Sequence, residues 1–206
     1  MDLKFEGPPS LSIGAVSDLT LHDDAVEQLL YVFDGSGTAN GTPVGRDTAI
    51  HVPAGASLDL RGAMTVVLST CPVSFRAAET ARNPPPQGIP RSARNDTRIV
   101  RLDDQPVQTT GDRWYRELIQ GETTMFVGSI PPGRAPDHFH LYEEVLCILD
   151  GVGVMHQGGT SRPIARGSCA FLPRTQRHCV ENTGSGELRL LGVFYPAGSP
   201  AVRYPA

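Results

Sequence analysis

The sequence contains almost no lysine: Lys4 is the only one in 206 residues, against seventeen arginines. Because Lys4 stands in an expected N-terminal tail, this scarcity argues against enzymes that need a Schiff-base lysine or a phosphate-loop lysine. The chain also has no apolar run that approaches the ~20 residues of a membrane helix. It does not begin with a basic segment followed by an apolar stretch, as a signal peptide does. We therefore expect a cytoplasmic protein with no membrane contact.

Basic charge is scarce as well. The chain has 18 basic and 22 acidic residues, a formal net charge of -4, whereas nucleic-acid binders normally carry a clustered basic face. We expect no nucleic-acid partner. The four cysteines include no CxxC pair, and we expect free thiols that pack as small hydrophobic side chains. A bridge between Cys169 and Cys179 on neighbouring strands is conceivable, but the expected compartment does not favour it.

Helical periodicity is rare in the chain. The best short candidate, residues 23–30, merges into an apolar run that is typical of a strand. Glycine (22) and proline (18) are spread throughout, and many short apolar runs between such turns predict an all-β sandwich or barrel. The expected strands are residues 28–33, 48–52, 64–69, 98–102, 123–127, 144–149, 168–172 and 188–194.

Two stretches of the sequence resemble each other. Residues 29–37 read LLYVFDGSG and residues 145–153 read VLCILDGVG. Pro53 and Pro173 follow them in the same order, so a strand, an Asp-Gly turn, a returning strand and a Pro turn occur twice. This order indicates a duplicated β unit. Chance similarity between apolar strands is the alternative.

The region between the two stretches has the composition of a linker. Residues 79–97 contain three consecutive prolines, further proline and glycine, and several charges, which is typical of an extended connection. We therefore expect a first unit at residues 1–78 and a second unit at residues 98–206.

Four side chains with metal-binding chemistry gather in the second unit. His138 and His140 are two residues apart, so on a strand they point to the same face. Glu144 lies just beyond them, and His178 belongs to a later expected strand. Three imidazoles and one carboxylate suit a divalent first-row metal and leave coordination positions for water, substrate or dioxygen.

The spacing of these residues resembles the cupin superfamily. The first cupin motif is usually written G(X)5HXH(X)3,4E(X)6G, and the second G(X)5PXG(X)2H(X)3N. The first is matched, with one residue fewer after its first glycine, by Gly133, His138, His140, Glu144 and Gly151. The second is matched at full spacing by Gly167, Pro173, His178 and Asn182, while Thr175 replaces the middle glycine. The resemblance covers about residues 113–197 closely and residues 10–78 loosely.

The resemblance implies a fold, a ligand set and a cofactor. The fold is all-β, with a double-stranded β-helix (jelly-roll) barrel in each of two tandem units, a bicupin. The implied metal ligands are His138, His140, Glu144 and His178. The implied cofactor is one divalent transition metal per chain, with Fe2+ favoured and Mn2+, Ni2+, Zn2+, Co2+ or Cu2+ also accepted by this donor set.

The first copy departs from the ligand pattern. Its corresponding positions are His22, Asp24, Gln28 and Leu58. A neutral amide and a leucine in place of two ligands should lower metal affinity sharply. Glu27 and His51 are the available substitutes. We expect the first unit to be a structural partner of the second.

Residues next to the motifs are candidates for catalysis. Tyr142 has the strand parity of His140 and is expected to act with Glu144 at the site. Arg134, Asp137 and Arg177 flank the motif histidines, and an arginine can hold a substrate carboxylate with two hydrogen bonds. Among them we favour Arg134 as a catalytic residue. Solvated loop charge is the alternative.

These features favour a metal-dependent enzyme that acts on a small organic molecule, most plausibly an Fe(II) dioxygenase whose substrate chelates the metal through adjacent oxygens. A non-redox isomerase, lyase or cyclase uses the same ligands, because the fold does not determine the reaction. A non-catalytic small-molecule binder is the alternative from another class. A monomer and a homodimer both fit, since two units in one chain imitate a cupin dimer.

Overall fold

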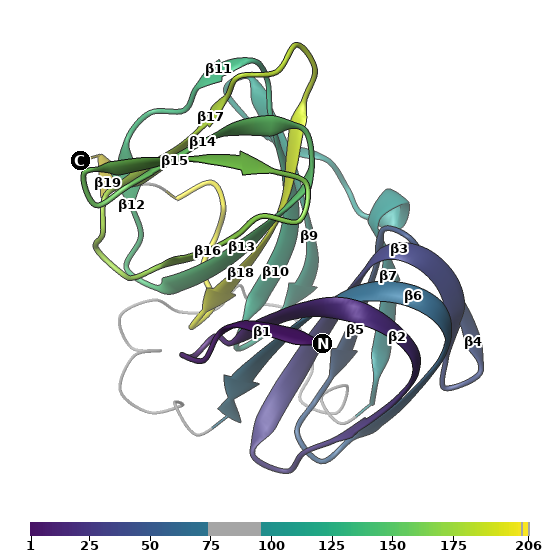
Figure 1. Ribbon diagram of the computed structural model, residues 1–206. Coiled ribbons are helices and arrows are strands. Elements are labelled where there is room, and N and C mark those ends of the chain that lie inside the picture. Colours follow the sequence, from purple (N-terminus) through teal and green to yellow (C-terminus); the bar gives the residue numbers. More distant parts are fainter. Residues whose placement is uncertain (74–95, 203, 206) are drawn as a thin grey trace.

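The computed structural model describes residues 1–73, 96–202 and 204–205, and its regular structure is almost entirely β-strand (Figure 1). The helical candidate at residues 23–30 is instead a turn followed by a strand, because the apolar residues from Leu29 onward are buried on both faces of a sheet. No helix in the described part of the chain is long and apolar enough to span a membrane. Of the linker expected at residues 79–97, only residues 96 and 97 lie within the described ranges.

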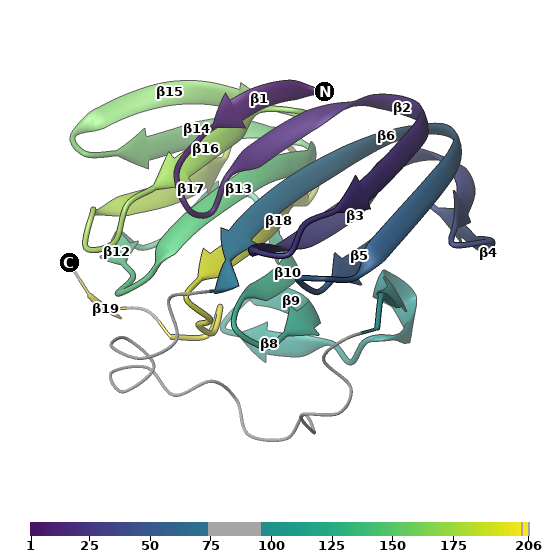
Figure 2. The same ribbon diagram turned by 90° about the horizontal axis from the view of Figure 1, so that it is seen from below.

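The first sheet has seven strands in the order β1-β2-β6-β3-β5-β7, with β4 paired to β3. Its strands are β1 (Asp2–Phe5), β2 (Leu11–His22), β3 (Val26–Ala39), β4 (Thr42–Gly45), β5 (Thr48–Val52), β6 (Ser57–Pro72) and β7 (Arg98–Arg101). The long strands β2, β3 and β6 curve together around a cluster of buried aliphatic side chains (Figure 2). Strand β7, expected in the second unit, pairs with β5 and so belongs to this sheet.

The second and third sheets face each other and close the jelly-roll barrel. The second has the order β16-β13-β18-β10-β9-β8, and the third β15-β14-β17-β12-β19 with β11 paired to β17. The second sheet contains β8 (Gln108–Thr110), β9 (Arg113–Gln120), β10 (Thr124–Ile130), β13 (Glu143–Asp150), β16 (Cys169–Leu172) and β18 (Leu188–Tyr195). The third contains β11 (Gly133–Arg134), β12 (His138–Phe139), β14 (Val152–Gln157), β15 (Thr160–Ala165), β17 (His178–Asn182) and β19 (Tyr204–Pro205).

Strand β13 is buried on both faces, which explains its uninterrupted apolar sequence. Alternate residues such as Leu146 and Ile148 point into the barrel, where they meet Met155 of the third sheet. The residues between them, such as Val145, point the other way and pack against Tyr31 of the first sheet. The protein is therefore a three-layer structure in which the middle sheet contributes to two cores.

A polar contact also joins the first sheet to the barrel. The hydroxyl of Tyr31 donates a hydrogen bond to Asp47 at 2.5 Å, and Arg189 of β18 pairs with the same carboxylate at 3.2 Å. The expectation of two tandem units with boundaries at 78 and 98 remains a prediction.

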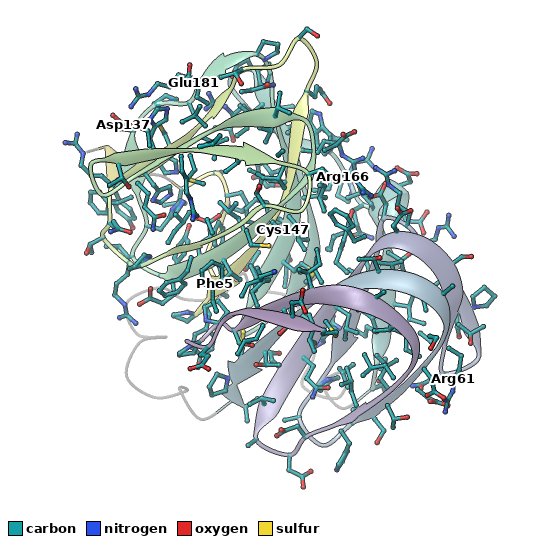
Figure 3. The ribbon with its side chains drawn as sticks, viewed as in Figure 1. Phe5, Arg61, Asp137, Cys147, Arg166 and Glu181 are labelled. Atoms are coloured by element: carbon teal, nitrogen blue, oxygen red, sulfur yellow. The ribbon has the colours of Figure 1, made fainter. Side chains whose placement is uncertain are left out.

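The cysteines are free thiols, as expected. Cys169 lies on β16 opposite Cys147 of β13, whereas Cys179 lies on β17 in the other sheet of the barrel. Cys169 and Cys179 therefore do not lie on neighbouring strands, as a bridge between them would require. Cys147 lies between the barrel and the first sheet (Figure 3).

Candidate metal centre

The three motif histidines meet at one end of the barrel. His138 on β12 is in register with His178, the first residue of β17. His140 follows β12, and its backbone carbonyl accepts a hydrogen bond from the amide of Thr175 at 2.7 Å. The nitrogen atoms that the three imidazoles offer lie within 4.8 Å of one another. This group could hold a metal ion, as the spacing of the motifs predicts.

Glu144 of β13 lies beside two of these histidines. Its Oε2 atom lies 3.5 Å from Nε2 of His140 and 3.8 Å from Nε2 of His178. The side chains of all three residues are almost fully buried. A small cation at the centre would have three nitrogen donors and one carboxylate oxygen, a donor set that divalent first-row metals accept.

Backbone carbonyls orient two of the imidazoles. Nδ1 of His138 donates to the carbonyl of Pro136 at 3.0 Å, and Nδ1 of His178 donates to the carbonyl of Gln176 at 2.9 Å. An imidazole that donates through Nδ1 keeps the lone pair of Nε2 for a metal, and such partners are typical of metal-binding histidines. Both rings are therefore held in the tautomer that metal binding requires.

Burial disfavours charge in the metal-free site. It raises the pKa of Glu144 to about 8 and lowers the pKa of His178. An unpaired carboxylate in such surroundings is costly, whereas a dication would favour its ionised form. The residues present therefore fit a divalent metal, both in their donor atoms and in their electrostatics.

The four residues line a cavity of about 100 Å³ inside the barrel. Most of its wall is apolar, with Phe126, Phe194 and Leu146 among its residues. Gly192 leaves room for the ring of Phe126, because a Cβ at position 192 would clash with that ring. The cavity has a polar end, where the histidines and Glu144 lie, and apolar walls, which is the usual composition of a small-molecule site.

Two of the expected catalytic residues lie outside this cavity. The ring of Tyr142 stacks on His140 with centroids 4.8 Å apart, and its hydroxyl donates to the carbonyl of Ser199 at 2.9 Å. Burial raises the pKa of Tyr142, so it supports His140 as a neutral phenol. Arg134 is half-exposed and pairs with Asp137 at 3.1 Å on the surface of the barrel.

Arg177 and Asp137, which also flank the motif histidines, lie at the surface of the barrel. Arg177 is exposed, although the next residue, His178, is buried. Figure 3 shows Asp137 at the outer edge of the barrel. The structure therefore brings the expected ligands close together, while Arg134, Asp137 and Arg177 beside them lie at the surface.

Sequence reasoning missed Arg113, which lines the cavity. It lies two residues before Tyr115 on β9, and this spacing was the available signal, because two such residues of a strand face the same side. Tyr115 belongs to the core inside the barrel.

The first sheet does not rebuild the site. His22 and Asp24 are exposed and pair with each other at 3.6 Å, while Gln28 is buried in the sheet. Glu27 and His51, the possible substitutes, form a buried pair at 2.8 Å. Glu27 precedes Gln28 on β3 and so lies on the opposite face of the strand. Within the described ranges, the cluster of His138, His140 and His178 is the one such histidine, cysteine or carboxylate group.

Comparisons with known proteins agree with this geometry. A family model described as a cupin domain matches residues 126–194. An oxalate-binding protein of Thermotoga maritima is 35% identical over 82 residues, which cover 38% of this chain and 68% of the relative.

Solved structures extend the likeness to most of the fold. AerE from Microcystis aeruginosa superimposes with a TM-score of 0.70 at 13% identity, covering 93% of this chain and 90% of that one. Oxalate decarboxylase of Bacillus subtilis, a protein with Mn(II) centres, superimposes with a TM-score of 0.61 at 15% identity, covering 96% of this chain and 76% of that one. With its two spaced motifs, its jelly-roll barrel and these relatives, the chain belongs to the cupin superfamily.

Proposed function

We propose that this protein is a metal-dependent enzyme acting on a small organic molecule, with Fe(II)-dependent dioxygenation as the favoured reaction. The observation that carries the proposal is the group of His138, His140 and His178, with the buried Glu144 beside two of them, at one end of an apolar cavity. Four protein donors leave one or two coordination positions, which suffice for a chelating substrate and a second small ligand. When bound, Fe(II) would bring the substrate and dioxygen together and mediate the transfer of electrons from the substrate to dioxygen.

The protein's own residues orient the imidazoles, supply a negative charge and line the cavity with apolar groups. The carbonyls of Pro136 and Gln176 hold two imidazoles in the metal-binding tautomer. The stacked ring of Tyr142 supports the third. Because Glu144 is almost fully buried beside aromatic and aliphatic walls, its charge acts in surroundings of low polarity.

Non-catalytic binding of a small carboxylate chelator is the second candidate. It is favoured by the relative from Thermotoga maritima, which is named an oxalate-binding protein. Oxalate offers two adjacent oxygens to a metal, as the favoured mechanism also requires of a substrate. Isomerase, lyase or cyclase chemistry, in which the metal acts as a Lewis acid, uses the same ligands.

The first experiment is elemental analysis of untagged protein purified under nitrogen, followed by oxygen-uptake measurements with catechols, diketones and hydroxy acids. About one iron per chain and substrate-dependent oxygen uptake would support the proposal. One manganese, nickel or zinc per chain without oxygen uptake would replace dioxygenation by Lewis-acid chemistry or by binding alone. Failure to take up any of these metals, even on reconstitution, would contradict the metal site itself.

A further inference from the structure

The cavity contains a positive side chain far from the histidines. Arg113 begins β9 and lines the same cavity as His138 and Glu144. Only 15% of its side-chain surface is exposed. A nearly buried guanidinium in an apolar cavity normally has a carboxylate or several hydrogen-bond acceptors beside it.

Arg113 has little of this support from the described part of the chain. Its Nε atom is buried without a hydrogen-bond partner, and the carboxylate of Asp112 is 3.9 Å away and mostly exposed. Arg116, which follows on the same strand with the opposite parity, also has a buried Nε without a partner, but its terminal nitrogen is paired. It donates to the carbonyl of Leu102 at 2.8 Å and to Asp103 at 3.2 Å. Unlike Arg116, Arg113 makes no hydrogen bond through its terminal nitrogens to the described residues, so these are the donors that it offers to a ligand in the cavity.

The strand register places Arg113 away from the metal donors. Trp114, its neighbour, is in register with Ser129 of β10, which is in register with the second residue of β18. Glu144 is in register with Phe194, the last residue but one of β18. The second and the last-but-one residues of β18 are therefore ~17 Å apart along the strand, at about 3.3 Å per residue. Even with the length of its side chain, Arg113 reaches a part of the ligand remote from the metal.

The charges of the cavity agree with an anionic ligand. A divalent metal, the carboxylate of Glu144, three neutral imidazoles and Arg113 leave an excess of positive charge. In surroundings of low polarity, this excess strongly favours a ligand with more than one negative group.

We propose that Arg113 determines specificity by binding a carboxylate of the ligand, while the opposite end of the same ligand chelates the metal. The substrate class is then a chelating acid with a second, remote anionic group. This inference rests on the proposed function, since it requires the metal at the other end.

The test uses the full chain loaded with Mn2+ and calorimetric binding of matched acids. The diacids are 2-oxoglutarate, 2-oxoadipate and 2-oxopimelate, each compared with the monoacid of equal carbon number (2-oxopentanoate, 2-oxohexanoate and 2-oxoheptanoate). For at least one pair, we expect the diacid to bind about tenfold or more tightly, which is the effect of a charge-assisted hydrogen bond. Arg113→Gln should abolish this preference, and Arg113→Lys should keep part of it.

Controls separate this role from a structural one. Arg101→Gln removes an exposed arginine of β7 and should leave the preference unchanged. The manganese content of Arg113→Gln should equal that of the parent protein, and oxalate, which lacks a remote group, should bind both within about twofold. If oxalate binds but no diacid is preferred, or if Arg113→Gln retains the preference, only the role of Arg113 is refuted and the proposed function stands. If the metal-loaded protein binds none of these acids, both the role of Arg113 and the proposed function are refuted.

Discussion

The Oε2 atom of Glu144 and the Nε2 atom of His140 lie 3.5 Å apart, with both side chains buried. The two residues are four positions apart in sequence, and a bend at residues 141–142 separates them. The contact therefore depends on the chain bending into β13, so that the carboxylate faces back to the imidazole. A bound cation would replace this direct contact by two metal–ligand bonds.

Replacing His140 by alanine should abolish metal binding while preserving the barrel. One of three nitrogen donors is lost, and the metal content should fall from about one per chain to below about one tenth. Plasma mass spectrometry and circular dichroism measure the two properties. His156→Ala is the matched control. His156 follows the inward-pointing Met155 on β14, so it lies on the outer face of the third sheet, where it pairs with Glu181 of β17. Equal metal content in both variants would show that the ligand assignment is wrong.

The metal-free protein should become less stable as the pH rises from about 4.5 to 8 because of Glu144. Burial raises the pKa of Glu144 to about 8 from its ordinary value of 4.5, so the unfolded chain loses this proton at lower pH than the folded chain does. Stability then falls with pH by at most about 1.4 kcal/mol per unit. Glu144→Gln removes this dependence.

Chelator-treated Glu144→Gln should therefore melt at a higher temperature than the parent protein at pH 8.5, and at the same temperature near pH 5. His178, whose lowered pKa acts in the opposite direction, is present in both proteins and cancels from the comparison. Differential scanning calorimetry across this range provides the measurement. A constant difference between the two proteins would contradict the buried carboxyl.

Gly192→Ala should disturb both the core and the metal centre. The added Cβ would overlap the ring of Phe126 and lie 3.3 Å from Oε1 of Glu144. We expect a loss of about 1–3 kcal/mol in the free energy of unfolding and weaker metal binding. Gly186→Ala is the control, since its Cβ meets no atom within 4 Å. Urea unfolding of both variants measures the effect, and similar stabilities would be inconsistent with the packing described.

Thr175→Gly should stabilise the protein. Thr175 stands where the second motif usually has glycine, and its φ of 64° lies in the left-handed region that a β-branched residue adopts only at a cost. Relief of this strain should exceed the entropic cost of glycine by about 1 kcal/mol. A thermal melt of Thr175→Gly, with Thr175→Ala as the comparison, tests the sign. A lower melting temperature for the glycine variant would show that Thr175 is held by contacts that outweigh the strain.

The sequence predicted the strands that are buried on both faces more successfully than those with an open face. The apolar runs at 28–33 and 144–149 lie within β3 and β13. Strands β2 and β15 did not stand out, because each has largely exposed residues and correspondingly few apolar ones. Strong periodicity requires a covered face.

The candidate site shows the same division. The proposed ligand set was readable because the two motifs fix residue types and spacing. Tyr142 and Arg134 share the sequence neighbourhood of the ligands, yet one packs behind His140 and the other lies on the surface. Arg113 was missed because its parity with Tyr115 indicates a shared face of β9 but not that this face lines the cavity.

The double burial of β13 has a consequence for dilute solutions. The residues behind Glu144 on this strand pack against the first sheet, and both belong to one polypeptide. This support forms intramolecularly, so its effective concentration does not depend on how much protein is present. A cupin barrel that obtained the same cover from a separate subunit would lose it on dilution, whereas this barrel keeps the layer behind its metal donors at any concentration.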